Sequence, residues 1–256
     1  MAKTKTAYVC TDCGSEYSRW LGQCNDCKAW NTISEFKAAK APASSRAGFS
    51  GYAGMTEAKV QTLDTIDLAD LPRFSSGFAE FDRVLGGGIV PGSATLIGGE
   101  PGAGKSTLLL QTMCTLSENM TALYITGEES LQQVAMRAKR LGLKADKLKL
   151  LSETSVENIC YIAEREKPKI IVIDSIQVMH MSDIQSAPGS VSQVREAAAF
   201  LTRFAKQNHV AMIIVGHVTK DGSLAGPKVL EHCIDCSIML EGSTDSRYRT
   251  LRGIKN

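Results

Sequence analysis

The sequence lacks a long apolar stretch, because no run of about 18 apolar residues occurs. Residues 1–10 also lack the apolar core of a secretory signal peptide. Neither sign of charge dominates, since 29 basic and 27 acidic residues leave a net charge of +2. That balance argues neither for nor against a nucleic-acid partner. These absences predict a cytoplasmic protein with no membrane partner.

What the chain does contain is a glycine-rich stretch that fits the phosphate-loop pattern G-x-x-x-x-G-K-[ST]. Its glycines let several backbone N–H groups converge on phosphate oxygens. Lys105 can reach the β- and γ-phosphates, and the Ser106 hydroxyl can take one Mg²⁺ position. Residues 93–98 predict a buried strand before the loop, and 106–116 predict a helix after it. The predicted ATP-binding residues are Gly99, Glu100, Pro101, Gly102, Ala103, Gly104, Lys105, Ser106 and Thr107.

Strands and helices are expected to alternate after this loop. This order predicts an α/β fold, with a mostly parallel sheet, helices on both faces and an antiparallel extension at the C-terminal end. A short helix is expected at 78–85. The further strands are expected at 122–126, 148–151, 169–174, 211–215, 234–240 and 248–254, and the helices at 130–141, 156–166 and 191–208.

Acidic side chains follow two of these strands, at the edge where ligands bind in such sheets. The apolar strand at 169–174 ends in Asp174, which is the Walker B pattern, and a carboxylate there can hold Mg²⁺ directly or through its water. Glu128 and Glu129 follow the strand at 122–126. One of them can act as general base on the water that attacks the γ-phosphate, and we favour Glu128. The alternative is an acid pair that favours the dipole of the next helix.

His217 is expected at the end of the next strand, where it could sense the γ-phosphate by a hydrogen bond, although a lone histidine is more often structural. Two polar, Gly/Pro-containing stretches leave the same edge, at 179–192 and 219–228. Both are expected to be mobile. Composition alone favours ordinary surface loops, and the alternative is contact with a nucleic-acid backbone through cations such as Lys220 and Lys228.

Four cysteines near the N-terminus form two C-x-x-C pairs, which is how a zinc ribbon gathers four thiolates around Zn²⁺. They are Cys10, Cys13, Cys24 and Cys27. Two disulfides or four unligated thiols are the alternatives, and a cytosolic location argues against disulfides. Four protein ligands leave no open position for a catalytic water, so we expect a structural site.

Three aromatic residues accompany this ribbon: Tyr17, Trp20 and Trp30. We expect them to cover its small core, and a stacking surface for a partner or a nucleic-acid base is the less favoured alternative. The remaining cysteines, Cys114, Cys160, Cys233 and Cys236, are expected to be buried apolar thiols. The composition divides the chain into a zinc ribbon at 1–36, a flexible linker at 37–60 and an ATPase domain at 61–256.

Together these motifs resemble the bacterial RadA (Sms) family of DNA-repair ATPases. The resemblance is carried by W-L-G-Q-C in the ribbon, F-D-R-V-L-G-G-G-I-V-P-G-S, the phosphate loop, T-G-E-E-S, V-I-D-S-I-Q and G-H-V-T-K-D-G. It implies a RecA-like core that hydrolyses ATP and acts as a motor on single-stranded or branched DNA in recombination and branch migration. It also implies ring-shaped homo-hexamers, DNA contacts at 179–192 and 219–228, and partners such as a RecA-type recombinase or a replicative helicase.

One departure from the family concerns the C-terminal end. The family continues the strand as K-N-R-F-G and adds a Lon-protease-like domain, whereas this sequence stops at Asn256. In RecA-like assemblies a cation here reaches the neighbouring subunit's γ-phosphate, which assigns that role to Lys255. We expect Lys255 to fray, and assembly and turnover to be weakened. The alternative function is a nucleotide-switched module that docks a partner through the ribbon.

Overall fold

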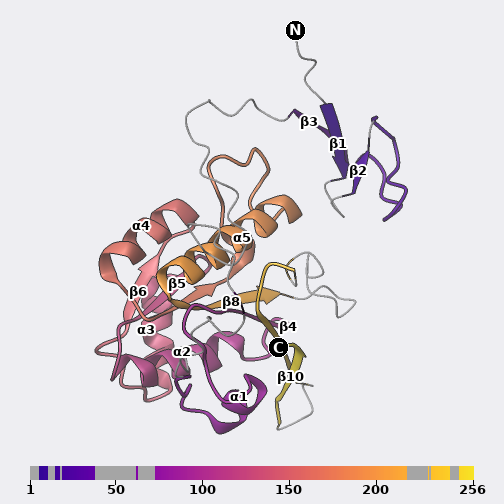
Figure 1. Cartoon of the computed structure of the whole chain (residues 1–256). Helices are drawn as coiled ribbons and strands as arrows, with labels where there is room; N and C mark the ends of the chain where they lie inside the picture. The colour runs from indigo at the N-terminus through magenta and orange to yellow at the C-terminus, as the bar shows by residue number, and fades with distance from the viewer. Residues whose placement is uncertain are drawn as a thin grey trace.

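The computed structural model describes residues 6–10, 15–17, 19–37, 62, 73–217, 230, 232–242 and 248–256. These residues form two separate sheets (Figure 1). The small sheet has the order β2-β1-β3, and its central strand is antiparallel to both neighbours. Its strands are β1 (Thr6–Cys10), β2 (Glu16–Tyr17) and β3 (Ile33–Lys37).

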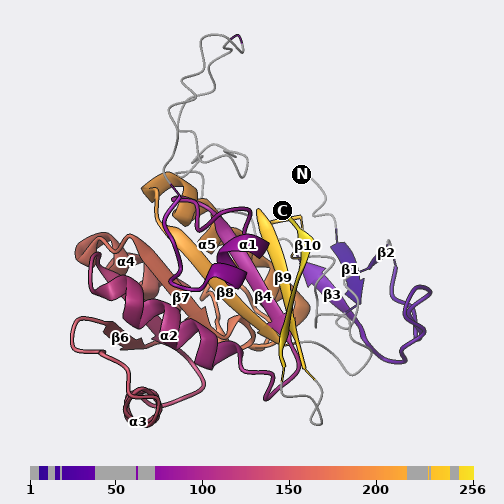
Figure 2. The ribbon, with the colours of Figure 1, turned by 90° about the horizontal axis from the view of Figure 1, so that it is seen from below.

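The large sheet has seven strands in the order β10-β9-β4-β8-β7-β5-β6, of which the first five lie side by side in Figure 2. All neighbours are parallel except β10, which pairs antiparallel with β9. The strands are β4 (Ala94–Gly99), β5 (Ala122–Thr126), β6 (Lys149–Ser152), β7 (Ile170–Asp174), β8 (Ala211–His217), β9 (Cys236–Glu241) and β10 (Thr250–Lys255).

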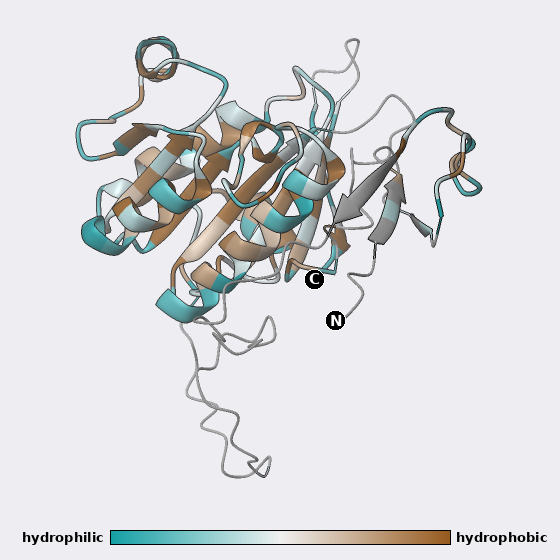
Figure 3. Cartoon of the chain, turned by 90° about the horizontal axis from the view of Figure 1, so that it is seen from above, coloured by the Kyte–Doolittle hydropathy of each residue, from teal (hydrophilic) through white to brown (hydrophobic). Residues whose placement is uncertain are grey.

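Helices cover both faces of this sheet, which is why its inner strands are apolar without alternation. On one face, side chains such as Leu123 and Ile171 pack against α4 and α5. On the other, side chains such as Val172 and Ile213 pack against α1, α2 and α3. Figure 3 shows the hydrophobic strands enclosed between helices whose outer surfaces are hydrophilic. The helices are α1 (Ala79–Val84), α2 (Lys105–Ser117), α3 (Leu131–Arg140), α4 (Val156–Glu166), the 3₁₀ turn η2 (Ile176–Val178) and α5 (Val191–Asn208).

The predicted α/β fold, with its mostly parallel sheet and antiparallel C-terminal strand, is confirmed. One boundary matters for the site. The strand expected at 211–215 continues to His217, because Gly216 and His217 pair with Gly98 and Gly99 of β4. His217 therefore belongs to the strand itself and lies beside Gly99, where the glycine-rich loop begins.

Several other expectations concern burial and coverage. Cys114, Cys160, Cys233 and Cys236 are buried, as predicted, and no disulfide joins the cysteines in the described ranges. None of the helices in the described residues is long and apolar enough to cross a membrane. Apart from Lys37, the predicted linker at 37–60 lies outside the described residues, as does the stretch at 219–228.

Candidate nucleotide and metal sites

The glycine-rich loop leaves the carboxyl end of β4, a strand in the middle of the large sheet. Gly102 and Gly104 have φ angles of +82° and +103°, a region that side chains rarely adopt. α2 begins directly afterwards at Lys105, and no side chain caps its first turn. The N–H groups of that turn therefore have no side-chain acceptor, and the helix dipole favours an anion there. This geometry suits a phosphate group.

Lys105 is buried beneath this loop, with only 4% of the residue exposed. Its Nζ donates to the carbonyl oxygens of Gly99 at 2.7 Å and Glu100 at 2.9 Å. Burial lowers the pKa of the Lys105 ammonium, and the carboxylates of Asp174 and Glu128 act in the opposite direction. The lysine and both acids thus lie within electrostatic reach of one another. Ser106 and Thr107 are partly exposed on the same first turn.

Asp174 ends β7, two strands away from β4. Its carboxylate accepts a hydrogen bond from the phenol of Tyr124, a buried residue of β5. Its backbone carbonyl accepts the Gly127 N–H at 2.9 Å, which holds the end of β5 against the end of β7. These contacts bring the predicted Mg²⁺ ligand and the acidic pair after β5 to one place.

Glu128 is held by two neighbours at this edge. Ser175, fully buried just after β7, donates its hydroxyl to Glu128 Oε1. His217 Nε2 lies 3.2 Å from the same oxygen. His217 Nδ1 is buried and has no hydrogen-bond partner among the described residues. The predicted contact of His217 with a γ-phosphate stays a prediction, and what the structure shows is a contact with the predicted base.

Glu129 has a different environment, although it is the next residue. Its carboxylate forms an ion pair with Arg137 of α3. Its backbone N–H and carbonyl are both bonded to the Thr126 hydroxyl, at 3.0 and 2.9 Å. The Glu129 carboxylate is therefore engaged by α3, whereas Glu128 acts electrostatically on Lys105 and contacts Ser175 and His217. This difference favours Glu128 as the base.

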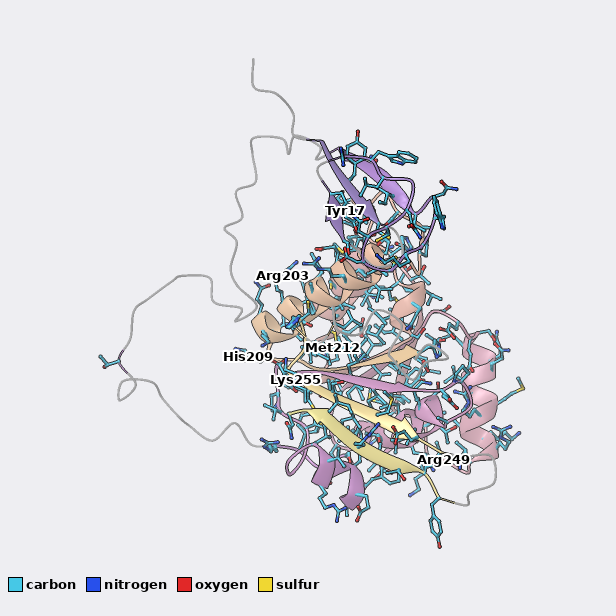
Figure 4. The ribbon with its side chains drawn as sticks, turned by 90° about the vertical axis from the view of Figure 1, so that its right-hand side faces the viewer. Tyr17, Arg203, His209, Met212, Arg249 and Lys255 are labelled. Carbon is cyan, nitrogen blue, oxygen red and sulfur yellow. The ribbon has the colours of Figure 1, made fainter. Side chains whose placement is uncertain are left out.

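Lys255 lies at the far end of the sheet from the glycine-rich loop. It pairs with Ser237 near the start of β9, and its Nζ donates to the Ile234 carbonyl at 2.6 Å. Figure 4 shows Lys255 and Arg249 at opposite ends of β10. The expectation that Lys255 frays is wrong, because strand pairing and this hydrogen bond hold it. Its role toward a neighbouring subunit stays a prediction.

The stretch at 179–192 is more ordered than we expected. Gln193, which is 2% exposed, accepts the Met181 N–H at 3.0 Å. Its amide nitrogen donates to the carbonyls of Met181, Ile184 and Ser186 at 3.0–3.3 Å. One buried side chain therefore organises most of the turn. The expectation of a mobile loop, drawn from its Gly, Pro and Ser content, missed this interaction.

A separate cluster of thiols forms in the small sheet. The Sγ atoms of Cys10, Cys24 and Cys27 all lie within 4.8 Å of one another, and Cys10 and Cys24 are buried. Cys13, the fourth predicted ligand, lies outside the described residues. Three converging thiols fit a tetrahedral metal such as Zn²⁺, and the role of Cys13 as the fourth ligand stays a prediction.

The aromatic residues of this sheet divide into two groups. Tyr17 packs on the small core, and its hydroxyl lies 3.1 Å from Cys24 Sγ and donates to Asp26 at 2.8 Å. Trp20 and Trp30 are 56% and 69% exposed. The expectation that all three cover the core is therefore wrong for the two tryptophans. The core of this sheet has only three buried residues, Cys10, Cys24 and Ile33, so it needs little cover and both indoles stay exposed.

The sequence reasoning also missed three polar partners in the large domain: Tyr124, Ser175 and Gln193. Each has a local signal. Tyr124 is an aromatic hydroxyl between Leu123 and Ile125 in a buried strand, and Ser175 directly follows the Walker B acid. Gln193 falls among apolar positions near the start of α5. A polar group at a core position predicts a buried hydrogen bond, although not its partner.

Comparisons with known proteins agree with this geometry. A family model described as an AAA domain matches residues 61–223, more than half of the chain. A second, described as a rubredoxin metal binding domain, matches residues 8–35. A KaiC-like protein from Pyrococcus horikoshii shares the fold, with a TM-score of 0.60 and 22% identity over 72% of this chain and 88% of that one.

The whole chain is also similar to curated bacterial proteins. It is 72% identical to the DNA repair protein RadA of Haemophilus influenzae, 67% to that of Escherichia coli and 49% to that of Bacillus subtilis. It spans 56% of the length of each. The resemblance to RadA that the motifs indicated is thereby confirmed, and the chain belongs to the AAA domain family.

Proposed function

We propose that the chain is the ATP-hydrolysing core of a RadA-type, DNA-dependent motor. The motor acts in DNA repair and recombination, by ATP-driven branch migration or unwinding of single-stranded and branched intermediates. One observation carries the proposal: Lys105, Asp174 and Glu128 converge at one edge of the sheet. They lie beside a helix N-terminus that no side chain caps. The names of the curated relatives support the place in DNA repair.

Each group has a part in this chemistry. Lys105 and the N–H groups of the glycine-rich loop bind the phosphates of ATP. The Ser106 hydroxyl and the Asp174 carboxylate would hold Mg²⁺, which neutralises phosphate charge when bound. Glu128 accepts a proton from the attacking water while the water oxygen bonds to the γ-phosphorus and the bond to the ADP oxygen breaks. The products are ADP and phosphate, and Glu128 then loses its proton to solvent.

The proposal extends to a ring of several copies. Lys255 lies at the opposite end of the sheet from the glycine-rich loop of its own chain. A γ-phosphate that Lys255 reaches would therefore belong to a second copy, as in a homo-hexameric ring. A cation supplied across an interface in this way stabilises charge on the transferring phosphoryl group.

The test is ATP turnover with and without a single-stranded oligonucleotide. We expect DNA to stimulate turnover. Glu128→Gln should lower kcat by about 10²–10⁴-fold while nucleotide binding persists, because only the proton acceptor is lost. Glu129→Gln is the matched control and should stay within a few-fold of the parent. Equal losses in both variants would remove the assignment of Glu128 as the base.

The same assay separates the alternative function. A nucleotide-switched binding module would bind ATP and change its affinity for a partner of the ribbon, such as a RecA-type recombinase or a replicative helicase. The contact between His217 and Glu128 favours coupling of the nucleotide site to the chain that follows β8. If DNA did not stimulate ATP turnover and partner binding depended on ATP, the switch hypothesis would be favoured over the motor.

A further inference from the structure

The zinc ribbon exposes both tryptophans of the protein on one surface. Trp20 and Trp30 are the two tryptophans in the sequence, and more than half of each is exposed. Gly22 lies between them: a Cβ placed there would lie 3.6 Å from Trp20 Cη2 and 4.0 Å from Trp30 Cζ3. Both six-membered rings therefore border the same glycine, whose missing side chain leaves them uncovered.

The backbone holds this surface in place. Trp20 Nε1 donates to the Ile33 carbonyl on β3 at 3.0 Å. Trp30 forms a β-bridge with Gln23, and the Asn31 N–H donates to the Gly22 carbonyl at 2.9 Å. The rings belong to the same short segment as the buried Cys24 thiol, so a bound metal would stabilise them further. Because these side chains are already ordered in the free protein, binding a ligand costs less conformational entropy.

The surroundings of the rings are polar and carry cations. Among the described residues of the ribbon, Trp20 and Trp30 are the large apolar side chains that are exposed, and no exposed aliphatic group joins them. Arg19 and Lys28 are exposed nearby in the chain. Among residues 19–31, which the structure describes in full, the exposed acid is Asp26, and its carboxylate accepts a hydrogen bond from the Tyr17 hydroxyl. Flat rings beside cations suit stacked bases and phosphates. Tryptophan and arginine also occur at protein interfaces, so the test below includes a protein partner as an outcome.

We propose that Trp20 and Trp30 form a stacking platform for the bases of single-stranded nucleic acid, and that Arg19 and Lys28 contact its phosphates. The platform deepens the proposed function, which makes DNA the expected polymer, but it does not depend on ATP hydrolysis. Stacking on an aromatic ring tolerates any base, so we expect little sequence preference.

The two tryptophans make the test direct, because tryptophan fluorescence of the intact protein reports on this surface alone. We expect a short single-stranded oligodeoxythymidine to quench it saturably, without nucleotide, and a duplex of the same length to quench it much less. Binding of a labelled oligonucleotide should weaken about 5- to 150-fold in Trp20→Ala or Trp30→Ala, the range of one stacked base. Arg19→Ala and Lys28→Ala should each lower the slope of log K against log salt by about 1.

Two controls keep the result interpretable. Tyr161→Ala removes an aromatic residue that is 68% exposed on α4, and it should bind the oligonucleotide like the parent. The metal content of every tryptophan variant is measured, so that loss of the ribbon fold is recognised. Trp20→Phe keeps a ring without the bond to Ile33 and should retain most of the affinity.

The platform is overturned if the oligonucleotide leaves the fluorescence of the parent unquenched. It is also overturned if the double Trp20→Ala/Trp30→Ala variant retains its metal and binds the labelled oligonucleotide with full affinity. Equal quenching by duplex overturns base stacking. A double variant that binds DNA normally but loses a protein partner assigns the surface to that partner instead. The oligonucleotide should quench the tryptophan fluorescence of Lys105→Ala as it does that of the parent. Failure of the ATPase proposal and failure of the platform are therefore distinguishable.

Discussion

The phenol of Tyr124 donates a hydrogen bond to the carboxylate of Asp174 on the neighbouring strand. Tyr124 is fully buried on β5, between β7 and β6. Burial, together with the adjacent carboxylate, raises the pKa of Tyr124 far above its usual range, so the phenol remains a donor at every physiological pH. The bond orients the carboxylate that we expect to hold Mg²⁺, in the way that outer partners orient metal ligands.

Tyr124→Phe should therefore change the Mg²⁺ dependence of ATP turnover. We expect the half-saturating Mg²⁺ concentration to rise by about tenfold, in line with the loss of one outer hydrogen bond, while kcat at saturating Mg²⁺ recovers. Stability should fall by about 1–3 kcal/mol. Mg²⁺ titrations and urea unfolding measure the two effects, with exposed Tyr161→Phe as control. An unchanged Mg²⁺ titration would show that the phenol is structural only.

Lys105 should be needed for ATP turnover, and its buried charge should lower the free energy of unfolding. Because its ammonium supplies charge to the phosphates, Lys105→Met should lose ATP hydrolysis by about 10²-fold or more. Burial lowers the pKa of Lys105, so the folded protein holds this proton less tightly than the unfolded chain does. In the absence of nucleotide at pH 7, the variant should be at least as stable as the parent.

The pH dependence of Lys105 gives the sign of this effect. The free energy of unfolding of the parent should rise as pH increases from the lowered folded pKa toward 10.5, because the unfolded chain binds more protons in that window. Lys105→Met lacks this contribution, so its stability advantage should shrink over the same window. Urea unfolding of both proteins at pH 7 and pH 10 measures the difference. A variant that is less stable at pH 7 would contradict the argument.

Ser175 should act on turnover through Glu128, because its hydroxyl bonds to that carboxylate alone among the described contacts. Ser175→Ala leaves the side chain of Glu128 with only His217 to orient it. We expect kcat to fall by about 3- to 30-fold, with the Kd for ATP unchanged, since the interaction matters for the proton transfer rather than for binding. Ser155→Ala, at the start of α4, is a control for loss of a serine hydroxyl.

The ribbon should hold one zinc ion per chain. Cys24→Ser should abolish it, because Cys24 contributes a buried thiol to the cluster. Such a small core does not fold without its metal, so the ribbon should unfold on chelation. Nucleotide binding should persist, since the two matched families occupy separate residues, 8–35 and 61–223. Elemental analysis and binding of a fluorescent ATP analogue measure the two outcomes, and zinc retained in Cys24→Ser would contradict the ligand set.

The fold could be predicted because its determinants are local. Apolar runs such as 170–173 are strands because both faces are covered, and the helix bounds at 156–166 and 191–208 follow the apolar period. The order of the strands could not be predicted in this way, because it depends on which crossovers pack. The pairing of β4 with both β8 and β9 is an example.

The candidate site could be predicted only in part, for a related reason. Strand-end position places Asp174, Glu128 and His217 at one edge of any parallel sheet. It does not say that His217 contacts Glu128, or that Ser175 does, because these bonds depend on side-chain directions across three strands. Exposure of Trp20 and Trp30 was missed for the opposite reason: a domain of this size has no room inside for two indoles.

Gly127 should connect the packing around η2 with the hydrogen bonds that hold Glu128. It is the residue before Glu128, and its N–H donates to the Asp174 carbonyl. A Cβ at this position would overlap Val178 Cγ2 and lie 3.1 Å from both Met179 Cε and Thr154 Cγ2. The close approach of η2 therefore requires glycine, and η2 follows directly on Ser175.

Gly127→Ala should push η2 away and loosen the bond between Ser175 and Glu128. We expect a loss of about 1–3 kcal/mol of stability, as for other overpacked sites, and a fall in kcat similar to that of Ser175→Ala. The matched control is Gly253→Ala on β10, where an added Cβ would meet Val84 Cγ1 at an ordinary 3.7 Å. Urea unfolding and ATP turnover measure both effects. If Gly127→Ala lost stability but kept its kcat, the packing of η2 would have no effect on the position of Glu128, and the proposed connection would be wrong.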